Sequence, residues 1–171
     1  MRKTLFFTKL GFHKTEETLS YMEKSGYRLT SIHNFGQFEF AESASKEVKY
    51  FFVYNYMKEH KNHELEDTLK SEFNANPIDG MITADDGVTR VYRITDTKSD
   101  LSELYAERDA YLLHVFFVRL LISISFLSIF TLALISGEGD ISRLFSIAAI
   151  ALLVLVFWNT IGVITLLIRR K

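Results

Sequence analysis

Two long apolar runs in the last third of the chain limit most strongly what it can fold into. The first, Tyr111–Ile135, contains only Arg119 and His114 as basic residues and no acidic residue, and the second, Leu144–Ile168, contains no charged residue. A helix rises about 1.5 Å per residue, so each run is long enough to cross a hydrocarbon layer about 30 Å thick. We therefore expect two transmembrane helices.

The alternative is a pair of buried helices in a soluble bundle. Such helices normally keep one polar stripe, whereas residues 120–122 and 152–157 are apolar on every side. The polar linker 136–143 between the runs is short, which predicts that the two helices lie antiparallel. The sequence therefore favours a transmembrane helical hairpin whose partner is the lipid bilayer.

Basic residues beside the runs predict the orientation of the hairpin. The linker contains one, Arg143, and the opposite side contains several: Arg108, Arg119, Arg169, Arg170 and Lys171. The side richer in Lys and Arg normally faces the cytosol. We expect a cell-membrane protein with two spans and both termini in the cytosol.

The first 110 residues have the length of one small domain. They carry 15 Lys and Arg residues against 19 Asp and Glu residues, and an acidic domain does not have the charge that nucleic-acid binding requires. The chain has no cysteine, which excludes disulfides and thiolate zinc sites. We predict no nucleic-acid partner and no cofactor.

Alternating polar and apolar residues predict several strands in this domain, and two stretches predict helices. Strands are expected at 5–10, 27–32, 37–40, 48–56, 81–83 and 88–94, with helices from an N-cap at Thr15 to Ser25 and from Asn62 to Asn74. Strand 48–56 is apolar on both faces, which is typical of a central strand. The predicted fold is α+β, a cytosolic antiparallel sheet with packed helices in ferredoxin-like layers, followed by the hairpin.

The expected divisions of the chain follow from these elements. They are a cytosolic α+β domain at 1–98, a juxtamembrane helix at 99–110, the first span at 111–135, an extracytoplasmic loop at 136–143, the second span at 144–168 and a basic tail at 169–171.

Several short motifs follow one another in an order that resembles a known family. They are Glu16, Leu19 and Met22 in an acidic helix, Gly26-Tyr27-Arg28-Leu29, Phe35-Gly36, Phe38-Glu39-Phe40, the tyrosine-rich stretch 50–56 and the segment 91–99 with its Thr-Asp-Thr-Lys-Ser run. The chain resembles the bacterial membrane proteins grouped as domain of unknown function 2812. The resemblance implies no catalytic residue and no activity, and it implies a regulatory setting beside transcriptional regulators of the PadR type.

An aromatic face is the first candidate site in the predicted domain. It comprises Phe38 and Phe40 from one strand and Tyr50, Phe52, Tyr54 and Tyr56 from a strand that we expect to adjoin it. Aromatic residues dominate ordinary cores, so core packing is the plain interpretation. The functional interpretation is a ligand pocket or a partner-docking face.

A polar pair within the membrane is the second candidate. Arg119 and Asn159 are expected at similar depth in antiparallel helices, and a charge at such depth suggests a functional site. The alternative is that Arg119 extends its guanidinium to the cytosolic surface.

The sequence contains two candidate metal sites, and neither has the arrangement that a metal ion requires. His60 and His63 lie near Glu59 and Glu64, but a helix that starts at His63 would not bring the two imidazoles onto one face. Asp85-Asp86-Gly87 fits a hairpin turn, because the alternate ligands of a calcium loop do not follow it. We predict no metal site.

Three functions remain open from the sequence. The first is a membrane-anchored module, not an enzyme, whose cytosolic domain binds a protein partner, a second copy of itself or a small ligand at the inner leaflet. The second is an enzyme with an unrecognised site that uses His33, His60 or His63. The third is a small accessory subunit of a transport complex, in which the hairpin carries the essential residues.

Overall fold

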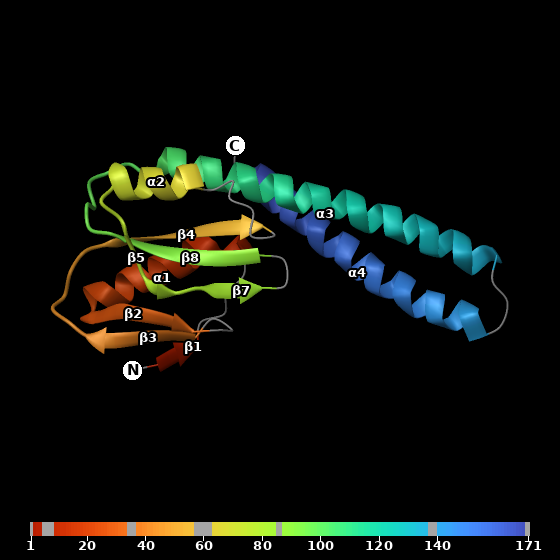
Figure 1. Cartoon of the computed structure of the whole chain (residues 1–171), viewed down its shortest axis with the longest axis horizontal. Coiled ribbons are helices and arrows are strands. Elements are labelled where there is room, and N and C mark those ends of the chain that lie inside the picture. Colours follow the sequence, from red (N-terminus) through yellow and green to blue (C-terminus); the bar gives the residue numbers. More distant parts are fainter. Residues whose placement is uncertain are drawn as a thin grey trace. The chain divides into compact units, whose positions relative to one another are not determined.

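Figure 1 shows the computed structural model of the chain, which describes residues 2–4, 9–33, 37–56, 63–84, 87–136 and 140–169. The chain divides into two compact units, Met1–Arg108 and Asp109–Lys171, which we call the amino-terminal domain and the helical hairpin. Strands and short helices build the first unit, and two long apolar helices build the second. The expected α+β sheet domain followed by a two-helix hairpin is confirmed.

The first sheet has the strand order β1-β3-β2-β6. Its strands are β1 (Arg2–Thr4), β2 (Tyr27–His33), β3 (Gln37–Glu42) and β6 (Asp79–Gly80). The first three pair antiparallel, and β6 joins β2 in parallel. Gly80 has φ +89°, and a Cβ there would lie 2.0 Å from the carbonyl oxygen of Ile32. Only glycine therefore fits where β6 approaches β2.

The second sheet is formed around β8. Its strands are β4 (Lys49–Tyr56), β5 (Asn76–Pro77), β7 (Ile82–Ala84) and β8 (Gly87–Ile94). β4 pairs antiparallel with β8 along its whole length, from Lys49 opposite Ile94 to Tyr56 opposite Gly87. The expectation that β3 and β4 adjoin is wrong, because the two strands belong to different sheets.

Helix α1 (Phe12–Lys24) packs against β2 of one sheet and β4 of the other. Its buried apolar side chains include Phe12, Leu19 and Met22. The predicted N-cap at Thr15 is wrong, because the helix begins at Phe12 and the Thr15 hydroxyl donates to the Gly11 carbonyl one turn back. A 3-10 helix, η1 (Lys9–Gly11), precedes α1 at the end of the expected first strand, and residues 5–8 of that strand lie outside the described residues.

The opposite face of β4 and β8 packs against α2 (His63–Ser71) and the first turns of α3 (Ser102–Ser136). The core there consists of Phe51, Val53, Leu65, Leu69, Ala75, Tyr92, Ile94, Leu101 and Leu104. β4 has only β8 as a neighbour among the described strands, so it is an edge strand and not the expected central one. It is apolar on both faces because helices cover both faces.

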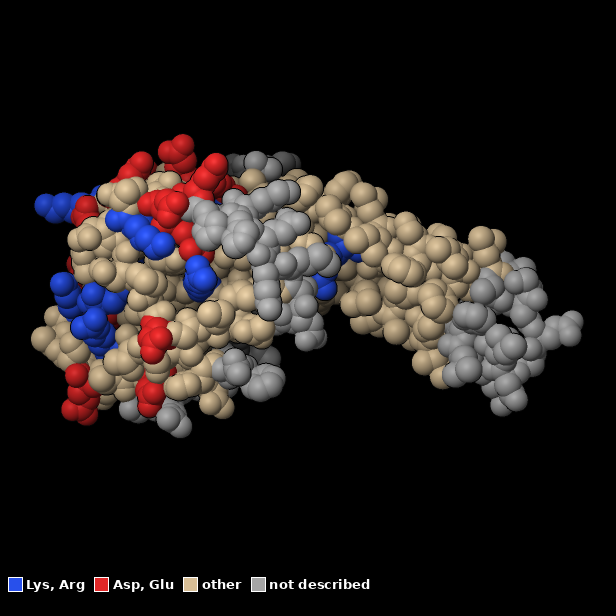
Figure 2. Space-filling model, in the orientation of Figure 1, with Lys and Arg blue, Asp and Glu red and all other residues tan. Residues whose placement is uncertain are grey.

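The hairpin consists of the rest of α3 and of α4 (Asp140–Arg169). Both helices are long and apolar enough to cross a membrane, and only 17% of the residues in the most apolar window of each are buried. A core helix of a soluble protein would be mostly buried. Figure 2 shows that charged side chains gather on the amino-terminal domain, while the visible described surface of the two long helices is almost free of them.

Gly162 on α4 lies in close contact with Phe116 on α3. A Cβ at Gly162 would lie 2.4 Å from a carbon of the Phe116 ring, so the phenyl group occupies the space that a side chain would need. Small residues allow this close approach of helices in apolar surroundings.

We expect Gly162→Ala to destabilise the hairpin by about 1–3 kcal/mol, because the added methyl group forces the helices apart. Thermal unfolding of the full-length protein in detergent micelles, followed by circular dichroism at 222 nm, would measure the loss. Ile164→Ala on the exposed side of α4 is the matched control. The double variant Gly162→Ala, Phe116→Ala should lose less than the sum of the two single variants, and strict additivity would contradict the contact.

Candidate functional site

A pocket of about 630 Å³ opens on the amino-terminal domain. Four parts of the domain line it: α1, the start of β4 with the residue pair before it, the segment after β8, and the beginning of α3. The lining residues are His13, Glu16, Glu17, Ser20, Glu47, Val48, Lys49, Tyr50, Thr97 and Tyr105. Its size lies within the range of small-molecule sites, about 300–1,000 Å³.

Glu16 is a buried carboxylate on the wall of this pocket, with 3% of its surface exposed. Its Oε1 accepts a hydrogen bond of 2.8 Å from the backbone N–H of Phe52 and another from the guanidinium of Arg108. Its Oε2 has no hydrogen-bond partner among the described residues and lies 3.7 Å from Nδ1 of His13. Burial raises the pKa of the Glu16 carboxyl above its ordinary value, against the opposing influence of Arg108.

Arg108 lies beside the pocket with 1% of its surface exposed. Its guanidinium carbon lies 4.8 Å from the ring centre of Phe51, 5.1 Å from that of Tyr105 and 5.4 Å from that of Phe12. A cation among aromatic faces gains stabilisation that increases as water is excluded. These rings and Glu16 together hold the charge of Arg108 inside the domain.

A second buried pair lies two turns further along α1. Glu23 accepts hydrogen bonds from Arg93 on β8, at 2.9 Å from Nε, and from the hydroxyl of Tyr50 at 2.5 Å. Burial acts to raise the pKa of the Glu23 carboxyl, but the hydrogen bonds from Arg93 and Tyr50 lower it below its ordinary value overall. Burial and the neighbouring Glu23 carboxylate raise the pKa of Tyr50. This pair connects α1 to both strands of the β4/β8 pair.

The predicted aromatic face lies mostly inside the domain. Five of its members, Phe38, Phe40, Tyr50, Phe52 and Tyr54, are buried, and Tyr56 is half-buried. The Phe52 ring stacks on that of Phe12, with 5.3 Å between centres. Tyr50 is the one member that lines the pocket. A role of this set as a ligand or partner face stays a prediction.

The predicted polar pair lies in the hairpin. Asn159 is buried, its Nδ2 donates a hydrogen bond of 2.8 Å to the carbonyl of Leu155, and its Oδ1 has no hydrogen-bond partner among the described residues. Arg119 is half-buried on α3. An interaction between Arg119 and Asn159 stays a prediction.

Of the three histidines considered from the sequence, the structure describes the side chain of His33. His33 is exposed, and its Nε2 lies 3.1 Å from Glu39 and 3.3 Å from the Ser31 hydroxyl. His60 lies outside the described residues, as do Glu59 and Asp85-Asp86, and so does the side chain of His63. Among the described residues no three His, Asp or Glu side chains form a group that could hold a metal ion.

The burial of Glu16 and Glu23 was not predicted from the sequence. The expected N-cap at Thr15 places Glu16 in the first turn of a helix, where acidic residues are common. The signal available was spacing, because Glu16 and Glu23 are seven residues apart and share one helical face with the buried Phe12 and Leu19. Their arginine partners lie 92 and 70 residues further along the chain, beyond the reach of a local pattern.

Residues 11–115 match the family model described as a protein of unknown function (DUF2812). This match covers more than half of the chain. The chain belongs to the DUF2812 family. The DUF2812 match includes every residue that lines the pocket, together with Arg93 and Arg108. No curated protein and no solved structure shows significant similarity to the chain.

Proposed function

We propose that this DUF2812 protein is a membrane-anchored binding module. Its two apolar helices span the bacterial inner membrane, and its amino-terminal domain lies in the cytosol and binds a small ligand in the pocket beside Glu16. Ligand binding is proposed to regulate a partner at the inner leaflet.

One observation carries the proposal: a single helix serves both parts. α3 runs without a break from Ser102 to Ser136, contributes Tyr105 to the pocket wall and continues as an apolar helix long enough to cross a membrane. A ligand that contacts Tyr105 therefore contacts the same helix that is proposed to enter the bilayer. Such a continuous helix can carry a change from one site to another.

The direction of insertion follows from the basic residues beside the helices. The charge bias toward Arg108, Arg119 and the last three residues supports a cytosolic domain and cytosolic termini. The exposed apolar surface of α3 and α4 supports lipid as the surrounding solvent.

We expect the full-length protein to sediment with the membrane fraction, to resist carbonate extraction and to dissolve only with detergent. Fluorescent-protein fusions at either terminus should fluoresce, whereas alkaline phosphatase fused there should be inactive, because the phosphatase needs the periplasm to form its disulfides. The same phosphatase inserted at Gly139 should be active. Recovery of the protein in the high-speed supernatant, or active phosphatase at a terminus, would contradict the proposal.

An enzymatic function is a second candidate, supported by the close approach of His13 and Glu16 on the pocket wall. A general base near a carboxylate is a common catalytic element. The hydroxyl of Ser20, however, donates a hydrogen bond of 2.8 Å to the Glu16 carbonyl and not to His13. Binding accounts for the pocket with fewer assumptions.

A further inference from the structure

We infer that the pocket takes an organic cation that carries a primary ammonium group. This inference rests on the proposed ligand-binding function and assigns the chemical class of the ligand. It starts from the carboxylates of the pocket wall, Glu16, Glu17 and Glu47.

Two of these carboxylates face solvent. Glu17 and Glu47 are exposed, and neither has an ion pair among the residues that the structure describes. Exposed carboxylates without an ion pair are solvated by water, so they cost the fold little free energy when the pocket is empty. They can accept hydrogen bonds from the ammonium group of a ligand.

The third carboxylate is buried and incompletely bonded. Glu16 uses Oε1 for Phe52 and Arg108, while Oε2 has no hydrogen-bond partner in the described part of the chain. This second oxygen lies on the side of His13, which also lines the pocket. A buried carboxylate oxygen without a hydrogen bond lowers the stability of the fold. A hydrogen-bond donor from a ligand would supply the missing bond.

Two cationic side chains at the pocket are already engaged. Arg108 is bonded to Glu16 and surrounded by three aromatic rings. The ammonium of Lys49 donates a hydrogen bond of 2.8 Å to the carbonyl of Ser99. Three carboxylates against these two cations leave a negative excess, which favours a positive ligand.

The geometry favours an organic cation over a metal ion. No three acidic or histidine side chains of the described residues are grouped closely enough to coordinate a metal. The volume of about 630 Å³ suits a molecule of several heavy atoms, and the half-buried Tyr105 offers it an aromatic wall. The pocket therefore suits a molecule of several heavy atoms that bears an ammonium group, and not a bare ion.

Tyramine is a suitable probe, because two molecules of nearly the same shape differ from it in charge. Tyrosol replaces its ammonium by a hydroxyl group, and 4-hydroxyphenylacetate carries a carboxylate in place of its aminomethyl group. Titration calorimetry at pH 7 on the full-length protein in nonionic detergent would compare the three. We expect tyramine to bind at least tenfold more tightly than either of the others.

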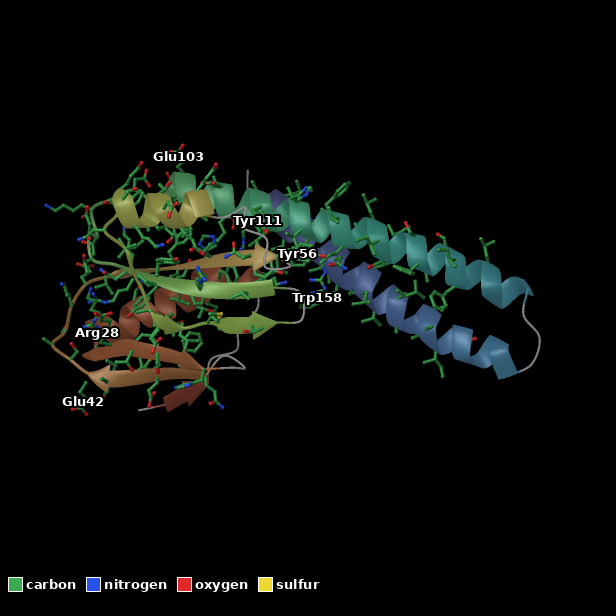
Figure 3. All side chains as sticks on the ribbon, viewed as in Figure 1. Arg28, Glu42, Tyr56, Glu103, Tyr111 and Trp158 are labelled. Carbon is green, nitrogen blue, oxygen red and sulfur yellow. The ribbon has the colours of Figure 1, made fainter. Side chains whose placement is uncertain are left out.

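Variants then locate the site. Glu17→Gln and Glu47→Gln should each weaken tyramine binding about threefold, and the double variant about tenfold, as expected for partly exposed charge pairs. Glu42→Gln is the matched control, since Glu42 is exposed at the end of β3 and does not line the pocket (Figure 3). Thr97→Trp places a large ring in the pocket wall and should abolish binding, with an unchanged thermal midpoint showing that the domain still folds.

The outcomes separate this inference from the proposed function. If tyrosol or 4-hydroxyphenylacetate binds as tightly as tyramine and Thr97→Trp abolishes that binding, the pocket binds ligands but the cation inference is overturned. If the double variant binds tyramine like the unaltered protein, the inference is also overturned. If none of the three probes binds, both the inference and the proposed ligand site fail.

Discussion

Replacing Arg108 by alanine is expected to lower the free energy of unfolding of the amino-terminal domain by about 3–5 kcal/mol. The substitution leaves the carboxylate of Glu16 buried without its counter-charge, and it removes the group that contacts the rings of Phe12, Phe51 and Tyr105. Urea unfolding of the full-length protein in detergent micelles, followed by the tyrosine signal in near-ultraviolet circular dichroism, would measure the effect.

Two controls show whether the loss of stability in Arg108→Ala comes from the unpaired carboxylate of Glu16. Arg28→Ala removes an exposed arginine on β2 (Figure 3) and should change the stability by less than about 0.5 kcal/mol. The double variant Glu16→Gln, Arg108→Met removes both charges at similar volume and should be more stable than Arg108→Ala alone. Equal stability of the double and single variants would contradict a charge-based origin.

Replacing Glu23 by glutamine is expected to cost about 3 kcal/mol at pH 7, because it leaves the guanidinium of Arg93 without a carboxylate. The pKa of Glu23 is lower in the folded domain than its ordinary value of 4.5. Its stabilising contribution is therefore fully present above about pH 4.5 and is lost as the pH falls through the folded-state pKa. The difference in stability between the variant and the unaltered protein should shrink as the pH is lowered.

A pH series of the same unfolding measurement, from pH 7 to pH 3, would test this. Glu42→Gln on the exposed end of β3 should follow the unaltered protein at every pH. A difference between Glu23→Gln and the unaltered protein that stayed constant from pH 7 to pH 3 would show that the ionised Glu23 does not stabilise the fold.

Local patterns predicted the elements of this chain better than their arrangement. The hairpin could be predicted because an all-round apolar helix is a property of consecutive residues. Strand 48–56 was found for the same reason, since its run of aromatic and β-branched residues is visible within eight residues. The N-cap of α1 was misplaced by four residues, from Gly11 to Thr15, because Thr15 has the residue type of an N-cap but bonds as an interior helical residue.

Strand pairing and the candidate site depended on contacts between distant residues. Nothing in the residues of β3 and β4 shows that β4 pairs with β8 and not with β3. The pocket is likewise assembled from segments as far apart as His13 and Tyr105. The predicted aromatic face identified the interior of the domain, whereas the charged groups of the pocket were not recognised as a site.

The extent of the amino-terminal domain has a practical consequence for obtaining it in soluble form. Leu101 and Leu104 belong to the core between the β4/β8 pair and α2, and Arg108 belongs to the buried ion pair. A truncation at residue 98, where the sequence places the end of the domain, would discard all three and expose the apolar surface that they cover. An expression fragment should therefore retain the first turns of α3 through Arg108. Its new carboxyl end should lie before the apolar run that begins at Tyr111.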